Sequence, residues 1–165
     1  MMTLDRFKAA RSVLQGVILE TNLIQSPALS RTCGNNVYLK PENMQITGAY
    51  KIRGAYYKIS TMSDKDRQRG LITASAGNHA QGVAYAAQAA GVSATIVMPT
   101  TTPLVKVNNT KDYGANVILY GATFDDAAAK AIAEGKSNYL HDVAYAAYFA
   151  MKEDVKKAMK VFSNL

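Results

Sequence analysis

The sequence alternates short apolar segments, rich in β-branched residues, with longer segments of helical periodicity. Four strand candidates are each followed by a helix candidate: 36–40 and 49–59, 71–74 and 78–90, 93–98 and 103–114, 116–120 and 127–133. Strands that alternate with helices in this way form a mostly parallel sheet with helices packed on it. We therefore predict the α/β class, with a parallel, twisted sheet of about four strands flanked by helices.

Both ends of the chain are predicted to be helical. Near the N-terminus, apolar residues recur at close to helical spacing, at Leu4, Phe7, Leu14 and Ile18. After residue 136 the strand–helix alternation stops, and an apolar stripe runs beside a lysine-bearing face. We predict that residues 139–165 form one amphipathic packing helix after an α/β domain at 1–138, rather than a membrane or calmodulin-type helix.

Composition excludes several classes of protein. The 165 residues, 48% hydrophobic and 19% charged, are enough for one domain with a core. No apolar run approaches the roughly 20 residues of a membrane helix, and charges interrupt the N-terminus too early for a signal peptide. The single cysteine, Cys33, fits a reducing cytoplasm. We predict a cytoplasmic protein without a metal site.

The net charge of +7 attracts anions in general, including nucleic acids, phosphates and carboxylates. The lysines and arginines are scattered, however, and no zinc-finger spacing or RNA-binding aromatic motif accompanies them. The pattern therefore favours a solvated basic surface over nucleic-acid binding.

Two loops that follow strands hold the most unusual residues, and ligands of parallel sheets bind beyond the carboxyl ends of the strands. The first loop, 41–48, leads to Lys51, which is expected in a first helical turn. The helix dipole disfavours an ammonium ion there by about 0.3–1 kcal/mol. If the site is also desolvated, the pKa of the amine falls and a neutral amine can attack an aldehyde. The alternative is an ordinary surface lysine.

The second loop, 75–77, joins a strand to a helix whose first N–H groups can bind a carboxylate or phosphate. Ser75 can add a hydroxyl donor and Asn78 an amide. The alternatives are a simple helix cap and, for His79, a structural histidine.

Together the two loops carry a resemblance. Residues 40–55 read KPENMQITGAYKIRGA, and residues 73–82 read TASAGNHAQG. This pair, in this order, resembles the fold-type II enzymes that depend on pyridoxal 5′-phosphate (PLP), and most of all their threonine dehydratase (threonine ammonia-lyase) and serine racemase branch. The resemblance covers roughly residues 3–138, including VMPTTTP and GANVILYGATFDDA, and implies the small domain of such an enzyme.

The resemblance implies a role for each matched residue. Lys51 matches the lysine that bonds to the cofactor aldehyde and later moves the α-proton of the substrate. Tyr50 stands where the family usually has a phenylalanine against the cofactor ring. Asn78 matches the asparagine that hydrogen-bonds the PLP 3′-oxygen. The loop that grips the substrate carboxylate matches Ser75, Ala76, Gly77, Asn78 and His79.

One position separates reactions within this branch. Serine racemases carry a second serine, a proton carrier, where this chain has Ala76. A methyl group cannot carry a proton, so Ala76 favours β-elimination over racemisation. The resemblance implies an enzyme of amino-acid metabolism, in isoleucine biosynthesis or threonine catabolism. It would remove water from L-threonine or L-serine to give a 2-oxo acid and ammonia. The resemblance also implies a homo-oligomer.

The family's glycine-rich loop for the PLP phosphate has no counterpart, since no two of the 11 glycines are adjacent. A phosphate without such a loop would be held weakly. We therefore expect the front portion of a lyase, with reduced or no activity by itself. The alternatives are a non-catalytic ligand-binding or assembly module and a serine racemase-like enzyme.

Overall fold

A three-stranded parallel sheet forms the centre of the computed structural model, which describes residues 3–138. Its strands lie in the order β3, β4, β5 and comprise Leu71–Ala74, Ala94–Met98 and Asn116–Leu119. Thr95 on β4 pairs with Ile72 on one side and with Asn116 on the other. The predicted α/β class is confirmed.

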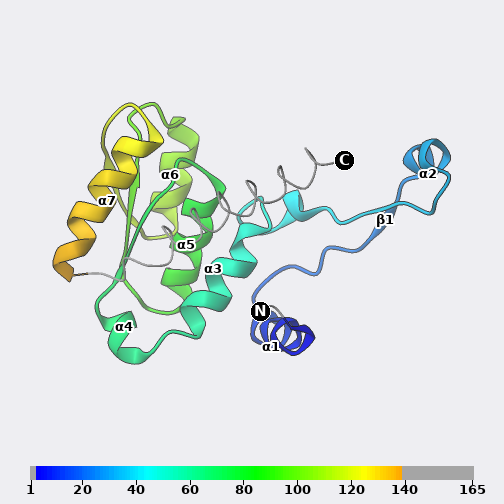
Figure 1. The fold of residues 1–165 in the computed structure, drawn as a ribbon, viewed down its shortest axis with the longest axis horizontal. Helices are drawn as coiled ribbons and strands as arrows, with labels where there is room; N and C mark the ends of the chain where they lie inside the picture. Colours follow the sequence, from blue (N-terminus) through cyan, green and yellow to red (C-terminus); the bar gives the residue numbers. More distant parts are fainter. Residues whose placement is uncertain (1–2, 139–165) are drawn as a thin grey trace, which may run out of the picture.

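Helices cover both faces of this sheet (Figure 1). On one face pack α3, α5 and α6, and on the other packs α7; these helices span Lys51–Ser60, Asn78–Ala89, Leu104–Asp112 and Phe124–Asn138. Alternation along β4 supplies both cores, because Ile96 and Met98 face α5 and α6 whereas Val97 faces α7. All three side chains are fully buried. The central strand is therefore apolar on both faces.

The first predicted strand, 36–40, is not part of the parallel sheet. Its central residues form β2 (Tyr38–Leu39), which pairs antiparallel with β1 (Ile24–Gln25). The segment between them contains α2 (Pro27–Cys33), and Figure 1 shows this arm projecting away from the sheet. In residues 3–138 the parallel sheet thus has three of the about four strands predicted, because the 36–40 segment pairs with β1 instead. An apolar pattern defines a strand but does not define its pairing partner.

The remaining described elements connect this framework. They are α1 (Leu4–Leu14), the short 3₁₀ helix η1 (Glu42–Met44) and α4 (Asp64–Gln68). The N-terminal helix is thereby confirmed, although Ile18 follows its end. The predicted helix at 139–165 lies outside the described residues. In the described part of the chain, no helix combines the length and apolarity needed to cross a membrane.

Local sequence signals set the helix boundaries. Thr123 and Asp126 form the expected reciprocal cap of α7: Thr123 Oγ1 accepts from the Asp126 N–H at 3.2 Å, and Asp126 Oδ2 accepts from the Thr123 N–H at 3.0 Å. Hydrogen bonds from Thr123 and Ala122 lower the pKa of the Asp126 carboxyl. These reciprocal bonds stabilise the start of α7.

Candidate functional site

The loop before Lys51 is tied to the helix that follows it by a bidentate ion pair. Arg53 on α3 donates through Nε to Glu42 Oε2 at 2.8 Å and through Nη2 to Glu42 Oε1 at 2.7 Å. Thr21 Oγ1 also donates to Glu42, at 2.9 Å. These hydrogen bonds, led by that of Arg53, lower the pKa of the Glu42 carboxyl to about 2. Glu42 therefore stays ionised and holds the loop on α3.

A buried glutamine fixes the next part of the same loop. The Gln45 amide donates to the Leu19 carbonyl at 2.7 Å and accepts from the Leu19 N–H at 3.2 Å. Tyr113, at the end of α6, donates its hydroxyl to the Ile46 carbonyl at 3.1 Å. Gly48 then adopts a positive φ of 69°, which turns the chain into α3. The backbone position of Lys51 is thus determined by several independent contacts.

Lys51 begins α3, as predicted, and α3 packs against α5 at this point. The contact is made by Gly82 on α5: a Cβ built there would lie 3.2 Å from Ile52 N and 3.3 Å from the carbonyl carbon of Lys51. Gly82 itself is buried. Only a glycine lets the two backbones approach this closely without displacement, and the approach places Lys51 beside the first turns of α5.

The start of α5 contains the second predicted loop. Ser75 is buried, and its Oγ accepts from the N–H groups of Gly77 at 3.3 Å and Ala80 at 3.2 Å. Ser75 thus caps the start of α5, and a simple helix cap is the alternative that the sequence left open for this loop. With Ala80 taken up in this way, Asn78 and His79 supply the first-turn N–H donors that remain for an anion.

Burial lowers the pKa of His79, and the charge of Lys51 contributes to this shift. Burial, and secondarily the nearby Lys51 ammonium, lower the pKa of the His79 imidazole. The predicted lysine and the predicted carboxylate loop therefore lie in one neighbourhood. Lys51 itself is exposed to solvent, so residues 3–138 do not supply the desolvation considered above.

The other predicted residues lie at or near this place. Asn78 is half-buried, and its Oδ1 accepts from Lys106 Nζ at 3.0 Å. Ala76 is exposed in the loop before α5, and Tyr50 is 63% exposed at the N-cap of α3. The Tyr50 ring therefore lies on the surface and does not pack in the described core.

Sequence reasoning missed the residues that position the site, namely Glu42, Arg53, Gln45, Gly82 and Lys106. Opposite charges on either side of the first loop could have indicated the Glu42–Arg53 pair. A small residue four positions after Asn78 could have indicated close helix packing at Gly82. No local signal indicates Lys106, because its partner lies 28 residues earlier in the chain.

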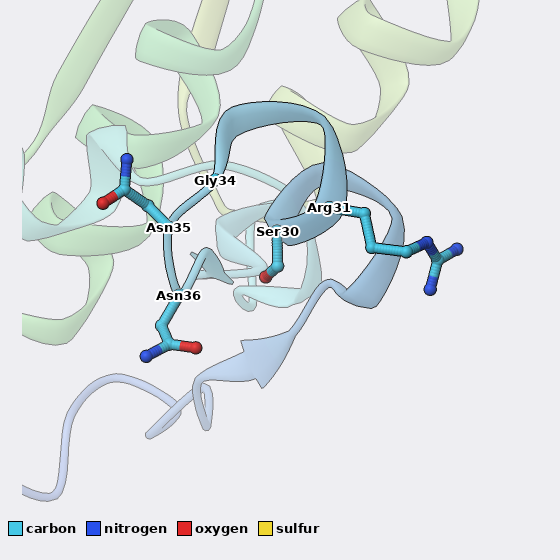
Figure 2. Close-up of a pocket in the computed structure, with 5 residues that line it drawn as sticks. All are labelled: Ser30, Arg31, Gly34, Asn35 and Asn36. Carbon is cyan, nitrogen blue, oxygen red and sulfur yellow. The ribbon is translucent and has the colours of Figure 1, made fainter.

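A separate surface hollow lies on the arm. It has a volume of about 400 Å³, and Figure 2 shows its lining residues: Ser30, Arg31, Gly34, Asn35 and Asn36. Ser30 accepts from the Val37 N–H at 2.9 Å, which joins α2 to the segment before β2. This hollow contains none of the predicted site residues. In residues 3–138, no three histidine, cysteine or acidic residues gather as a metal site would require.

Comparison with known proteins identifies the family of this chain. The model of a family described as "Pyridoxal-phosphate dependent enzyme" matches residues 14–158, which includes both loops. The chain belongs to this family. The match continues past residue 138, where the predicted resemblance ends.

The matching relatives include threonine ammonia-lyases and serine racemases. The chain is 52% identical over 132 residues to an L-threonine ammonia-lyase of Thermotoga maritima, covering 80% of this chain and 33% of that protein. Among solved structures, threonine deaminase isoform 2 of Solanum lycopersicum matches with a TM-score of 0.71 at 38% identity, covering 84% of this chain and 43% of that one. Maize serine racemase matches with a TM-score of 0.76 at 31% identity, covering 82% and 41%. The chain spans about a third of the length of the curated relatives it matches.

The residues present fit the reactive end of PLP. Lys51 offers an amine, and none of the ion pairs in residues 3–138 involves it. Asn78 offers an amide for a ring oxygen. No glycine-rich run for the phosphate occurs in the sequence. The fit is therefore to the aldehyde and ring-oxygen side of the cofactor.

Proposed function

We propose that this chain supplies the lysine and the substrate-carboxylate side of a PLP-dependent threonine/serine ammonia-lyase. Such an enzyme removes water from L-threonine or L-serine by β-elimination and yields a 2-oxo acid and ammonia. The observation that supports this proposal is the close approach of α3 and α5, where a Cβ on Gly82 would lie 3.3 Å from the carbonyl carbon of Lys51. Besides burial, the Lys51 charge contributes to the lowered pKa of His79, in the first turn of α5. The family membership supports the same assignment.

In this proposal the predicted residues divide the chemistry between them. When bound, PLP supplies an electron sink for the pair of electrons left when the α-proton departs. Lys51 Nζ binds the cofactor aldehyde and moves the α-proton. The N–H groups of Asn78 and His79 hold the substrate carboxylate at the positive end of α5. The neutral His79 imidazole adds no fixed charge to this anion site, because burial lowers its pKa.

Ala76 favours elimination over racemisation. It is exposed in the turn before α5, and its methyl group cannot deliver a proton to the substrate. A racemase needs such a donor on the face opposite Lys51. An Ala76→Ser variant that gains serine racemisation while retaining elimination would fit this account, whereas racemisation by the parent chain would favour the racemase alternative.

The test is spectroscopic and chemical. The chain is mixed with PLP, and the yellow absorbance of a lysine-bound cofactor is measured for the parent and for Lys51→Ala. We expect absorbance in the parent and none in the variant, and any 2-oxobutanoate made from threonine should be made by the parent only. Lys58→Ala is the matched control, because Lys58 lies on the exposed side of the same helix.

A non-catalytic module is the second candidate. The observation that favours it is the absence of a glycine-rich run for the cofactor phosphate in the sequence. A parent chain that gives no yellow absorbance with PLP, while remaining folded by circular dichroism, would support this candidate against the lyase.

The proposal also includes a cellular location and an oligomeric state. A cytoplasmic location is consistent with the exposed free thiol of Cys33, which would be exposed to oxidation outside a reducing compartment. A homo-oligomeric state follows from the family resemblance alone. Analytical ultracentrifugation of the purified chain tests it, and a monomer would remove it from the proposal.

A further inference from the structure

We propose that Lys106 is a positioning residue for the cofactor side of the site. Its ammonium group holds the Asn78 amide so that the NH2 group, and not the oxygen, is presented to a bound ring oxygen. This inference rests on the proposed function, because it assigns Asn78 to a cofactor contact. It adds a residue of α6 to a site otherwise built from α3 and α5.

The chemistry of lysine determines the orientation of the amide. Lys106 Nζ lies 3.0 Å from Asn78 Oδ1. An ammonium group carries three donors and no acceptor, so the amide oxygen must face it. The Asn78 NH2 group therefore points away from Lys106. An acceptor such as a phenolic oxygen then meets a donor, whereas the flipped amide would present it with a second oxygen.

The contact is one of two side-chain hydrogen bonds that join α5 and α6. One turn further along both helices, Asn109 Nδ2 donates to Gln81 Oε1 at 3.4 Å. Both pairs are separated by the same number of residues, from 78 to 106 and from 81 to 109. This matched spacing keeps α6 at a fixed height along α5. It also holds Lys106 at the level of the first turn of α5.

The helical turn that carries Lys106 packs against the core. Thr110 is fully buried and donates its hydroxyl to the Lys106 carbonyl at 2.8 Å. Val107, beside it, is buried in the core shared with α5. The burial of Val107 therefore holds this turn of α6 against the core, and the Lys106 side chain extends from it to Asn78.

Among residues 3–138, Lys106 forms no ion pair with an acidic side chain. None of the ion pairs in residues 3–138 includes Lys106 or Lys51. One ammonium group lies beside Asn78 and the other beside His79, both at the positive end of α5. Within these residues, no carboxylate therefore competes with Asn78 for the Lys106 ammonium group.

The experiment is a double-mutant cycle on the dissociation constant of PLP, measured by absorbance titration of the full chain. Lys106→Met keeps the aliphatic stem and removes the charge. We expect it to raise the dissociation constant about tenfold. In an Asn78→Ala background the same change should have less than a twofold effect, because Lys106 acts through Asn78. Lys111→Met, on the exposed end of the same helix, is the matched control and should bind as the parent does.

A second measurement does not depend on the cofactor. The side-chain NH2 resonances of Asn78, assigned by their loss in Asn78→Asp, report the orientation and rigidity of the amide. They should shift in Lys106→Met and stay in place in Lys111→Met. An unshifted resonance in Lys106→Met overturns the proposal, as does an equal loss of PLP affinity with and without Asn78. If the parent chain binds no PLP, the proposed function fails, and the amide resonance alone then decides whether Lys106 positions Asn78.

Discussion

Gly82 of α5 lies against the backbone of Lys51, and a Cβ at this glycine would come within 3.3 Å of the Lys51 carbonyl carbon. This contact joins α3 and α5, the helices that follow the two loops. It makes the position of the candidate catalytic amine depend on a residue without a side chain. The contact can be tested without any ligand.

Gly82→Ala should destabilise the chain, because the added methyl group must push the α3 backbone away by a few tenths of an ångström. A loss of about 1–3 kcal/mol is expected in urea unfolding. Gly54→Ala is the matched control: Gly54 lies in α3 with nothing within 4 Å of its built Cβ. There alanine should stabilise by about 0.5–1 kcal/mol. Equal effects at both sites would contradict the close packing.

The Glu42–Arg53 pair should make stability depend on acid pH. The pKa of Glu42 falls from its ordinary 4.5 to about 2 in the folded chain. The stabilisation is therefore complete above pH 4.5 and is lost as the pH falls from there to about 2. Its size is on the order of 2 kcal/mol. Urea unfolding at a series of pH values should show a flatter profile for Glu42→Gln than for the parent. Glu20→Gln, which removes an exposed carboxylate, should leave the profile unchanged.

His79 should titrate below its ordinary pKa of 6.5, because burial and the Lys51 charge both oppose its protonation. The unfolded chain binds this proton more readily, so stability should decrease as the pH falls below about 6.5 towards the folded pKa. In proton NMR, Lys51→Met should move the His79 midpoint part of the way back up. Lys58→Met should not move it. An unchanged midpoint in Lys51→Met would mean that the two residues are not neighbours, and the lyase site would lose its main support.

Gln45→Met should loosen the loop that leads to Lys51. The substitution keeps the length of the side chain but leaves the Leu19 N–H and carbonyl without their amide partner. We expect a loss of about 1–3 kcal/mol and faster hydrogen exchange at Leu19. Gln68→Met, on an exposed surface, provides the comparison and should be close to neutral. Normal exchange at Leu19 in the Gln45 variant would show that the amide does not hold this segment.

Periodicity in the sequence was sufficient for most of the fold. The apolar run at 93–98 became the buried β4, and the cap signal at Thr123 and Asp126 became the start of α7. The segment at 36–40 was predicted as a strand but assigned to the wrong sheet, because Tyr38 and Leu39 pair with Ile24 and Gln25. Pairing depends on which segments meet in space, and a local pattern contains no information about that.

The sequence predicted Lys51, Ser75, Asn78 and His79 as site residues from a first helical turn, a strand-to-helix turn and the resemblance that both loops carry. Tertiary structure decided how these residues are held. The Gly82 contact, the Glu42–Arg53 pair and the Lys106–Asn78 hydrogen bond each join segments distant in the chain. Local propensities act over a few residues, whereas packing and hydrogen bonds between helices arise only when the chain has folded.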